Sequence, residues 1–313
     1  SLHDALRSFV TGASGHIGSV VVRELLQAGH QVTGLARSDA SASALEAAGA
    51  QVHRGTLDDP DGLAAAAAAS DGVIHLAFTH DFSNYADSLQ TDLRAVEAMG
   101  EALAGSGKPF VNTSGTLMLA FGGAGRLGTE DADVDRSGPR VASELATLAL
   151  AERGVRSSVI RLAPTVHGDT DHHGFVPSLI EFARAAGRSG YLGDGSNRWP
   201  AVHTVDAARL YRLAVESAPA GSVLHGAAEQ GIAFRDIAQA IGEGLGVPVQ
   251  QIPADDASAH FGFLAGFAAL DNPTSSERTR AMLGWEPVQP TLLEDLKAGH
   301  YFANLRGAPP LWA

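Results

Sequence analysis

Three glycines spaced three residues apart are the feature of this chain that points most directly to chemistry. They lie between a predicted strand and a predicted helix, in the segment Thr11-Gly12-Ala13-Ser14-Gly15-His16-Ile17-Gly18. In that context Gly12 permits a tight turn, Gly15 lets the backbone approach a pyrophosphate, and Gly18 allows the helix to pack closely on the strand. The N-terminus of the helix supplies free N–H groups and a partial positive charge. The sequence therefore predicts that residues 11–18 bind a dinucleotide through its phosphates.

The residues after the second predicted strand bear on which dinucleotide this is. A site for NAD(H) usually carries a carboxylate there, which binds the hydroxyls of the adenosine ribose. This chain has Ala36 at that position, followed by Arg37 and Ser38. A guanidinium fits a 2'-phosphate through paired hydrogen bonds, and the serine could add a hydroxyl. We therefore expect NADP(H) as the preferred cofactor, while Asp39 leaves NAD(H) open.

Strands and helices alternate through the first half of the chain. Apolar runs bounded by turn residues predict strands at 5–10, 31–36, 51–54, 72–77, 109–113 and 157–162. Helical spacing predicts the intervening helices at 17–28, 40–48, 61–69, 89–103 and 140–153. Alternation at this pace is typical of an α/β protein with a Rossmann-type, doubly wound parallel sheet.

Beyond about residue 165 the alternation loosens. Helices are still predicted there, at 176–186, 205–217, 234–245 and 276–283. We interpret 5–165 as the dinucleotide-binding core and 166–313 mainly as a smaller C-terminal substrate-binding cap. Segments of the cap such as 222–225 are expected to return to the core.

Composition limits the classes of partner. The net charge of -13 argues against nucleic acid or an anionic membrane. No apolar run approaches the roughly 20 residues that span a bilayer, and the start lacks the basic and apolar regions of a signal peptide. The chain has no cysteine, which excludes disulfides and thiolate metal sites and fits a reducing compartment. We therefore expect a cytoplasmic protein whose partner is a small-molecule substrate.

The glycine pattern resembles the fingerprint of the short-chain dehydrogenase/reductase family, and further motifs extend the resemblance over about residues 10–245. Residues 73–77, Val-Ile-His-Leu-Ala, resemble the family's fourth strand, and residues 110–114, Phe-Val-Asn-Thr-Ser, resemble the strand that delivers the active-site serine. Residues 193–195 and 202–208 resemble the cap of the extended, epimerase/dehydratase-like branch. The resemblance implies an enzyme that moves a hydride to or from a nicotinamide dinucleotide.

The resemblance also implies cofactor contacts outside the glycine loop. Leu57 stands where the family places a residue that can pack against the adenine ring. The ends of the fourth and fifth strands, the start of the helix after 140, and the segment after the sixth strand would line the rest of the dinucleotide. These positions are Leu76, Ala77, Thr113, Arg140, Pro164, Thr165 and Val166.

The catalytic residues match the family only in part. The family takes a proton from the tyrosine of Tyr-x-x-x-Lys on a helix, and a serine on the neighbouring strand binds the substrate oxygen. Ser114 matches the serine, whereas alignment on Glu144-Leu145 puts Arg140 in the lysine position and Arg136 in the tyrosine position. Arg140 can hold the nicotinamide ribose. Arg136 is too weak an acid to donate a proton, so it would stabilise an oxyanion, bind a carboxylate or lie on a solvated loop.

Another group must then donate the proton, because no tyrosine lies between Tyr85 and Tyr191. Tyr85 follows the fourth strand, at the edge of the sheet where ligands bind in this fold. Tyr191 and His203 lie in the predicted cap, and His167 lies in a segment that the resemblance places near the nicotinamide. Histidine titrates in a useful range. A bound water is the remaining alternative.

Other motifs have simpler explanations. Residues 169–173, Asp-Thr-Asp-His-His, include metal-ligand types, but neighbouring histidines point apart, so we expect a solvated loop and no metal site. Arg198 and Trp199 either touch substrate or pack the cap. The apolar stripe at 261–267 is expected in a core or at a dimer face. The resemblance implies a homodimer through helices near 89–104 and 140–152.

Three functions follow from these residues. The main expectation is an NADP(H)-dependent oxidoreductase of a small carbonyl or alcohol, which lacks the usual tyrosine. The epimerase-like cap motivates a second, a sugar-type epimerase, dehydratase or lyase that keeps its nucleotide bound. The missing tyrosine motivates a third, a non-enzymatic NADP(H)-sensing protein.

Overall fold

A seven-stranded parallel sheet lies at the centre of the computed structural model, which describes residues 5–79, 84–121 and 125–303. From edge to edge the strands are β10 (Ser222–Gly226), β6 (Arg156–Leu162), β5 (Pro109–Gly115), β4 (Gly72–His75), β1 (Arg7–Thr11), β2 (Gln31–Ala36) and β3 (Gln51–Arg54). The chain enters at β1 in the interior and winds outward to both edges, with every neighbouring pair parallel. This topology confirms the predicted Rossmann-type doubly wound sheet.

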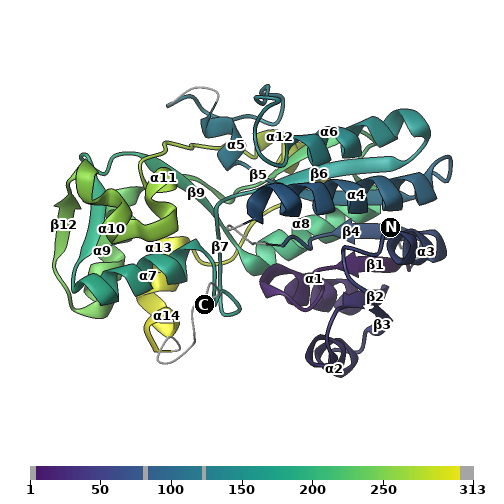
Figure 1. Ribbon diagram of the computed structural model, residues 1–313, viewed down its shortest axis with the longest axis horizontal. Coiled ribbons are helices and arrows are strands. Elements are labelled where there is room, and N and C mark those ends of the chain that lie inside the picture. Colours follow the sequence, from purple (N-terminus) through teal and green to yellow (C-terminus); the bar gives the residue numbers. More distant parts are fainter. Residues whose placement is uncertain (1–4, 80–83, 122–124, 304–313) are drawn as a thin grey trace.

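Helices cover both faces of this sheet (Figure 1). One face carries α1 (His16–Gln27), α2 (Asp39–Ala47) and α8 (Thr204–Ser217), and the other carries α3 (Pro60–Ala69), α4 (Tyr85–Leu103) and α6 (Val141–Ala149). Each face has its own apolar cluster, with Val21 and Leu25 of α1 fully buried on the first and Met99 and Leu103 of α4 fully buried on the second. Burial of each such side chain contributes about 2 kcal/mol, so the two layers position the strand ends firmly.

The predicted core helices begin within one residue of the predicted start, except α4, and the starts of α4 and α6 bear on the site. α4 starts at Tyr85, four residues before its apolar pattern becomes visible, because Ala86, Asp87 and Ser88 in its first turn carry no large apolar side chain. α6 starts at Val141, because Arg140 adopts a left-handed conformation with a φ of 65° and cannot continue a helix. α6 then ends in a 3-10 turn, η2 (Leu150–Arg153).

The cap is built from segments after residue 165 and lies at one end of the sheet (Figure 1). It contains a three-stranded sheet of β11 (Glu229–Ala233), β9 (Arg198–His203) and β7 (Thr165–His167), and a pair formed by β12 (Val249–Ile252) and β8 (Ser189–Leu192). Its helices are α7 (Phe175–Ala186), α9 (Phe234–Leu245), η3 (Ala254–Asp256), α10 (Ala257–Phe261), η4 (Gly262–Leu264), α11 (Ala265–Ala268), α13 (Leu292–Ala298) and α14 (His300–Ala303).

Aromatic residues fill the core of the cap. Trp199 and Phe234 are buried edge to face, with their ring centroids 4.9 Å apart. Phe261 is also buried in this cluster, and Phe263 and Phe267 pack against it. The stripe at 261–267 therefore contributes to the cap core, as one of the two expectations had it.

Several later segments lie outside the cap. β10 pairs with β6 in the central sheet, α8 packs against α1, and α12 (Glu277–Leu283) contacts β10. Earlier in the chain, the short α5 (Leu117–Ala120) follows β5.

The last residues of the predicted cap, 304–313, lie outside the described residues. α4 and α6, through which the resemblance implies dimerisation, lie side by side, and the dimer stays a prediction. Within the described ranges, no helix is long and apolar enough to cross a membrane.

Candidate active site

The loop between β1 and α1 has the geometry that an anion site needs. Gly12 has a φ of 66°, and a β-carbon there would lie 2.8 Å from the backbone nitrogen of Ala77. A β-carbon at Gly18 would lie 1.9 Å from the carbonyl oxygen of Gly12, so only glycine lets α1 begin this close to the turn. Gly15 caps α1 without a side-chain hydrogen bond, and the first turn contains no acidic residue. The free N–H groups of this turn therefore fit the phosphates of a dinucleotide.

Two residues of this loop use their side chains to hold the fold together. The buried hydroxyl of Thr11 accepts hydrogen bonds, both of 3.1 Å, from the two backbone nitrogens that follow β4. The imidazole of His16 lies 2.8 Å from the carbonyl oxygen of Val166 through Nε2, and 2.8 Å from the hydroxyl of Thr170 through Nδ1. Because both side chains already have partners, Thr11 and His16 can contact a cofactor only through their backbone atoms. Ser14, between them in the loop, is exposed.

The end of β2 carries a cation and no free carboxylate. Arg37 is exposed, and its guanidinium makes no hydrogen bond to the described residues. The hydroxyl of Ser38 caps α2 by accepting a 3.2 Å hydrogen bond from the backbone nitrogen of Ser41. Asp39, which left NAD(H) open, is paired with Arg54 at the end of β3, with 2.8 Å between Nη2 and Oδ1. This pairing occupies the carboxylate that left NAD(H) open.

Arg140 is held at the end of β5 by three contacts. Its Nη2 donates a 2.9 Å hydrogen bond to the carbonyl oxygen of Thr113 and lies 3.6 Å from Oδ1 of Asp92. Its guanidinium carbon sits 4.3 Å from the centre of the Phe78 ring, a cation–π contact. Its Nε is buried without a partner among the described residues. Together with its left-handed backbone, which costs about 1–2 kcal/mol, these features indicate a functional position.

A buried polar network links Arg140 to the glycine loop. Asp92, fully buried in α4, lies 3.2 Å from His75 Nε2 and accepts a 2.6 Å hydrogen bond from the Ser143 hydroxyl. The Thr11 hydroxyl already accepts two backbone bonds, so it donates its proton to Nδ1 of His75 at 2.7 Å, and Nε2 therefore carries the proton shared with Asp92. Burial opposes ionisation, but the hydrogen bond from His75 and the charge of Arg140 hold the pKa of Asp92 below its ordinary value.

Tyr85 stands at the first turn of α4, beside this network. Its ring lies edge to face with Phe78, with the centroids 6.0 Å apart, so it shares with Arg140 the ring on which the guanidinium rests. Burial raises the pKa of Tyr85, the positive charge of Arg140 lowers it, and the negative charge of Asp92 raises it again. The net pKa is above the ordinary value, so the phenol is protonated at neutral pH and close to a permanent cation.

The residues predicted around the family's tyrosine helix lie differently. Arg136 is exposed in a turn that Gly138 closes by a 2.8 Å hydrogen bond to Asp135, and residues 136–140 are not helical. The four-residue spacing therefore does not put Arg136 and Arg140 on one face, and the solvated-loop interpretation of Arg136 holds. Ser114 is buried at the end of β5, with Oγ 3.9 Å from the sulfur of Met118.

His203 belongs to a different cluster. Its Nδ1 accepts a 3.2 Å hydrogen bond from the backbone nitrogen of Val205 and so caps α8. Its ring packs edge to face against His167, whose Nδ1 is 2.7 Å from Asp295. Burial and the neighbouring His167 lower the pKa of His203, so it is neutral at physiological pH. Tyr191 lies in β8 against the Gly195 turn, within the cap.

The other predicted cofactor positions line the strand ends through backbone and apolar atoms. The hydroxyl of Thr113 donates to the carbonyl oxygen of His75 at 2.7 Å, and that of Thr165 donates to Pro200 at 2.5 Å. Neither hydroxyl points to solvent. The remaining positions are partly exposed: Ile17, Leu57, Leu76, Ala77, Pro164 and Val166.

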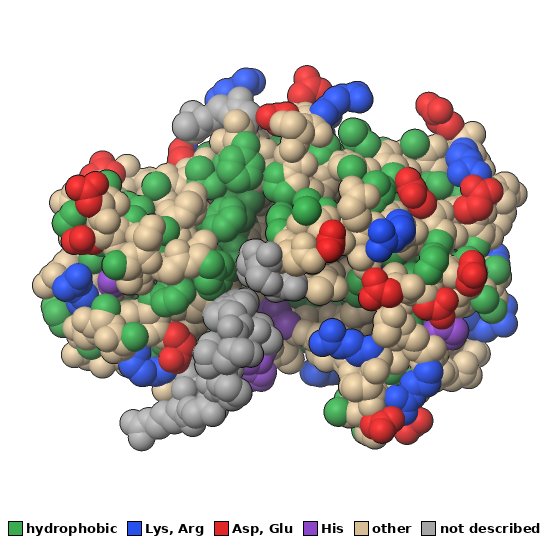
Figure 2. Space-filling model, in the orientation of Figure 1, with side chains coloured by type: hydrophobic (Ala, Val, Ile, Leu, Met, Phe, Trp, Pro, Cys, Tyr) green, Lys and Arg blue, Asp and Glu red, His purple; other side chains and the backbone are tan. Residues whose placement is uncertain are grey.

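The cap contributes an arginine that is already paired. Arg198 donates from Nε and Nη2 to the two carboxylate oxygens of Asp271, at 3.0 and 2.8 Å, and from its backbone nitrogen at 2.7 Å. Both residues line an open pocket with Leu192, Gly193, Asp194, Ser196, Asn197 and Ala269. Trp199 does not line this pocket; it is fully buried and packs the core of the cap. Figure 2 shows the surface hollowed between core and cap, with hydrophobic side chains along the hollow and histidine at its lower end.

Comparison with known proteins identifies the family. Residues 8–225 match the model of the NAD dependent epimerase/dehydratase family. The chain belongs to this family. An uncharacterized protein of Schizosaccharomyces pombe is 49% identical over 298 residues, which are 95% of this chain and 100% of that protein. A 2-alkyl-3-oxoalkanoate reductase of Stenotrophomonas maltophilia is 28% identical over 233 residues, 71% of this chain and 69% of that protein.

Solved structures show the same fold. A dTDP-glucose 4,6-dehydratase from Streptomyces venezuelae, solved with NAD bound, superposes with a TM-score of 0.75 at 20% identity, covering 96% of this chain and 98% of that chain. The resemblance found in the glycine motif and the strand ends is thus confirmed as membership of the NAD dependent epimerase/dehydratase family. Its relatives include reductases, dehydrogenases and an epimerase, so the family is one of nicotinamide-dependent enzymes.

Sequence reasoning missed the residues that organise this site. Asp92 and His75 are buried at 0% exposure and connect Thr11 to Arg140. A signal was present, since an aspartate on the inward face of an apolar helix requires a partner. The partner itself could not be named, because His75 lies on a strand 17 residues away.

Proposed function

We propose that this family member is an NADP(H)-dependent oxidoreductase that reduces the carbonyl group of a small, uncharged substrate, with Tyr85 as the proton donor. The observation that carries the proposal is the placement of the Tyr85 phenol beside Arg140 and Asp92 at the end of β5. This is a tyrosine–cation pair assembled from the first turn of α4 and the residue that precedes α6. It replaces the tyrosine–lysine pair that the family usually places on one helix.

The reaction needs one hydride and one proton. The bound dinucleotide would supply the hydride to the carbonyl carbon. The Tyr85 hydroxyl would donate its proton to the carbonyl oxygen, and the charge of Arg140 would stabilise the phenolate until water reprotonates it. The Ser114 hydroxyl would hold the same oxygen. Because the pKa of Tyr85 is raised by burial, the acid form predominates, which favours carbonyl reduction over alcohol oxidation at neutral pH.

Charge on the substrate side supports a neutral substrate. A nucleotide-linked sugar carries a diphosphate, which needs unpaired cations. Arg198 lines the open pocket of the cap, but its guanidinium is already hydrogen-bonded to both carboxylate oxygens of Asp271. This pairing disfavours a diphosphate at Arg198 and therefore disfavours the epimerase or dehydratase alternative. The reductase relative from Stenotrophomonas is consistent with the same choice.

The cofactor preference follows from the end of β2. Arg37 has no partner among the described residues, and Asp39 is neutralised by Arg54. An unpaired guanidinium binds a 2'-phosphate, whereas NAD(H) selectivity relies on a free carboxylate. The geometry therefore supports NADP(H), as the sequence alone suggests.

The test is NADPH oxidation over a panel of small aldehydes and ketones, comparing wild type with Tyr85→Phe. Loss of the donor should lower kcat about 10²–10⁴-fold with little change in the KM for NADPH. Tyr191→Phe, which removes a phenol from the cap, is the matched control and should retain wild-type kcat. Equal kcat in wild type and Tyr85→Phe would reject Tyr85 as the donor. NADPH binding without turnover of any carbonyl would instead support a sensing or nucleotide-retaining protein.

A further inference from the structure

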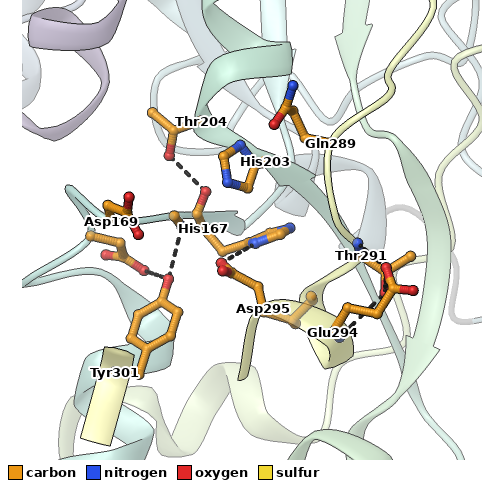
Figure 3. Close-up of polar contacts among 12 residues, drawn as sticks. His167, Asp169, His203, Thr204, Gln289, Thr291, Glu294, Asp295 and Tyr301 are labelled. Carbon is orange, nitrogen blue, oxygen red and sulfur yellow. Dashed lines mark hydrogen bonds and ion pairs between the residues drawn. The ribbon is translucent and has the colours of Figure 1, made fainter. Parts of the chain in front are cut away.

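Two imidazoles and a carboxylate converge where the core meets the cap (Figure 3). His167 ends β7, His203 ends β9 and is the N-cap of α8, and Asp295 lies in α13. One nitrogen from each imidazole and one carboxylate oxygen all lie within 4.8 Å of one another. These three residue types form the donor set of many zinc sites, and three separate elements deliver them.

The two imidazoles offer different nitrogens to a ligand. His167 is fully buried, its Nδ1 faces an oxygen of Asp295 at 2.7 Å, and its Nε2 makes no hydrogen bond among the described residues. His203 uses Nδ1 to cap α8, so the nitrogen left for a ligand is Nε2.

The surroundings hold both imidazoles in place. The Thr204 hydroxyl donates a 2.7 Å hydrogen bond to the carbonyl oxygen of His167, which fixes that backbone (Figure 3). Gly168 has a φ of 142°, and a β-carbon there would lie 3.2 Å from Nε2 of His203. Glycine at this position therefore lets the second imidazole approach the first. Asp295 has its other oxygen 3.6 Å from Nδ1 of His300, a partner that can orient the carboxylate.

We propose that His167, His203 and Asp295 bind one divalent transition-metal ion of the zinc type, with a water completing four-coordination. Imidazole ligands favour zinc over magnesium or calcium, which prefer oxygen. Ligand atoms around tetrahedral zinc are about 3.3 Å apart, given bonds of about 2.0–2.1 Å. The three donor atoms already lie within 4.8 Å, and an ion bound between His167 Nδ1 and Asp295 would replace the proton that these two groups share. His203 is partly exposed and marks the side from which the ion and its water enter.

This site differs from the loop at 169–173 whose histidines the sequence brings to attention. His172 and His173 are both exposed, with ring centroids 6.3 Å apart. The proposed site instead joins β7, the start of α8 and α13, so the ion would fasten the C-terminal helices to the core. Because it does not involve Tyr85 or Arg140, the proposal stands or falls separately from the proposed reductase activity.

The experiment titrates the full chain, stripped of metal with a chelator, with Co²⁺ as a spectroscopic substitute for Zn²⁺. Wild type should bind one Co²⁺ per chain with visible d–d absorption, and Zn²⁺ should displace it and raise Tm. Asp295→Asn removes the carboxylate. His203→Asn removes Nε2 but keeps a side chain that caps helices well. Each substitution should weaken Co²⁺ binding about 100-fold or more and abolish the Zn²⁺-dependent rise in Tm.

The matched control is the double variant His172→Ala/His173→Ala, which removes the exposed pair and should bind Co²⁺ like wild type. Metal-free circular dichroism spectra establish that each variant is folded before titration. Absence of stoichiometric binding in wild type overturns the proposal. So does binding that survives both ligand substitutions, or binding that is lost in the exposed-pair control.

Discussion

Asp92 and Arg140 lie 3.6 Å apart, from Oδ1 to Nη2, although one belongs to α4 and the other precedes α6. Their separation sets the electrostatic environment of Tyr85, because the arginine lowers the pKa of the phenol and the aspartate raises it. Asp92 also receives hydrogen bonds from His75 and Ser143, so in the proposed mechanism it would position Arg140 without touching the substrate itself.

Asp92→Asn should shift the pH dependence of kcat. Activity of wild type should fall at high pH as the Tyr85 donor ionises, and loss of the Asp92 charge lowers the pKa of Tyr85. The upper limb of the profile should therefore move to lower pH, accompanied by a stability loss of about 3 kcal/mol from breaking the buried pair. Asp87→Asn, an exposed substitution in the first turn of the same helix, is the control. An unmoved limb would contradict the electrostatic role of Asp92.

Arg37→Ala should reduce selectivity for NADPH over NADH. A hydrogen bond to a charged group is worth about 1.5–3 kcal/mol, so the KM for NADPH should rise about 10–100-fold while that for NADH changes little. Arg54→Ala should act in the same direction, since it frees the carboxylate of Asp39 to repel a 2'-phosphate and bind a ribose. Steady-state kinetics with both cofactors measure this. Arg23→Ala, an exposed change on α1, should leave both KM values as they are.

Two glycines of the loop should respond differently to alanine. In Gly18→Ala the new β-carbon would meet the carbonyl oxygen of Gly12 at 1.9 Å, so α1 must move, and both thermal stability and dinucleotide binding should be lost. In Gly15→Ala the contact would be 3.3 Å, which a small shift relieves. Melting should then change little, whereas calorimetry should show weaker dinucleotide binding. Equal effects of the two substitutions would indicate that Gly15 does not approach the phosphates.

An ion network between α1 and α8 should make stability depend on acid. Glu216 lies 2.9 Å from His30 Nε2 and 3.0 Å from Arg212. His30 Nδ1 accepts from the backbone nitrogen of Leu6, so Nε2 carries the proton and donates it to Glu216. Burial opposes ionisation, yet these two hydrogen bonds leave the pKa of Glu216 below its ordinary value. Because the pKa of Glu216 is lower in the folded than in the unfolded state, its ionised form stabilises the folded protein at pH values above the unfolded pKa of about 4.3. This stabilisation is lost as the pH falls through the folded-state pKa.

Glu216→Gln should therefore lower the free energy of unfolding by about 1–2 kcal/mol near neutral pH, and by progressively less below about pH 4. Denaturant unfolding at several pH values measures the difference. Glu243→Gln, an exposed change on α9, should show no such dependence. A deficit that stays constant down to acid pH would show that the charge of Glu216 is not what stabilises the pair of helices.

Much of the core was predictable because its signals are local. The hydrophobic period of each segment identified β1 to β6 and α1 to α4 to within a few residues, and the glycine spacing located the phosphate loop. The cap was predicted less completely. Its short strands β7, β8 and β12 have only three or four residues each, too few for a period to emerge, and they exist because neighbouring segments pair with them.

By itself the sequence determined where the chain turns and where a phosphate can approach, since both depend on the absence of a side chain at particular glycines. Only the tertiary structure decided which polar groups meet. Alignment to the family put Arg136 and Arg140 in the positions of the tyrosine and the lysine. In the structure Arg140 has a left-handed backbone, and its guanidinium bonds to the end of β5 close to Asp92. Contacts between segments that are distant in the sequence depend on how the helix and sheet layers stack, and no local sequence pattern encodes that stacking.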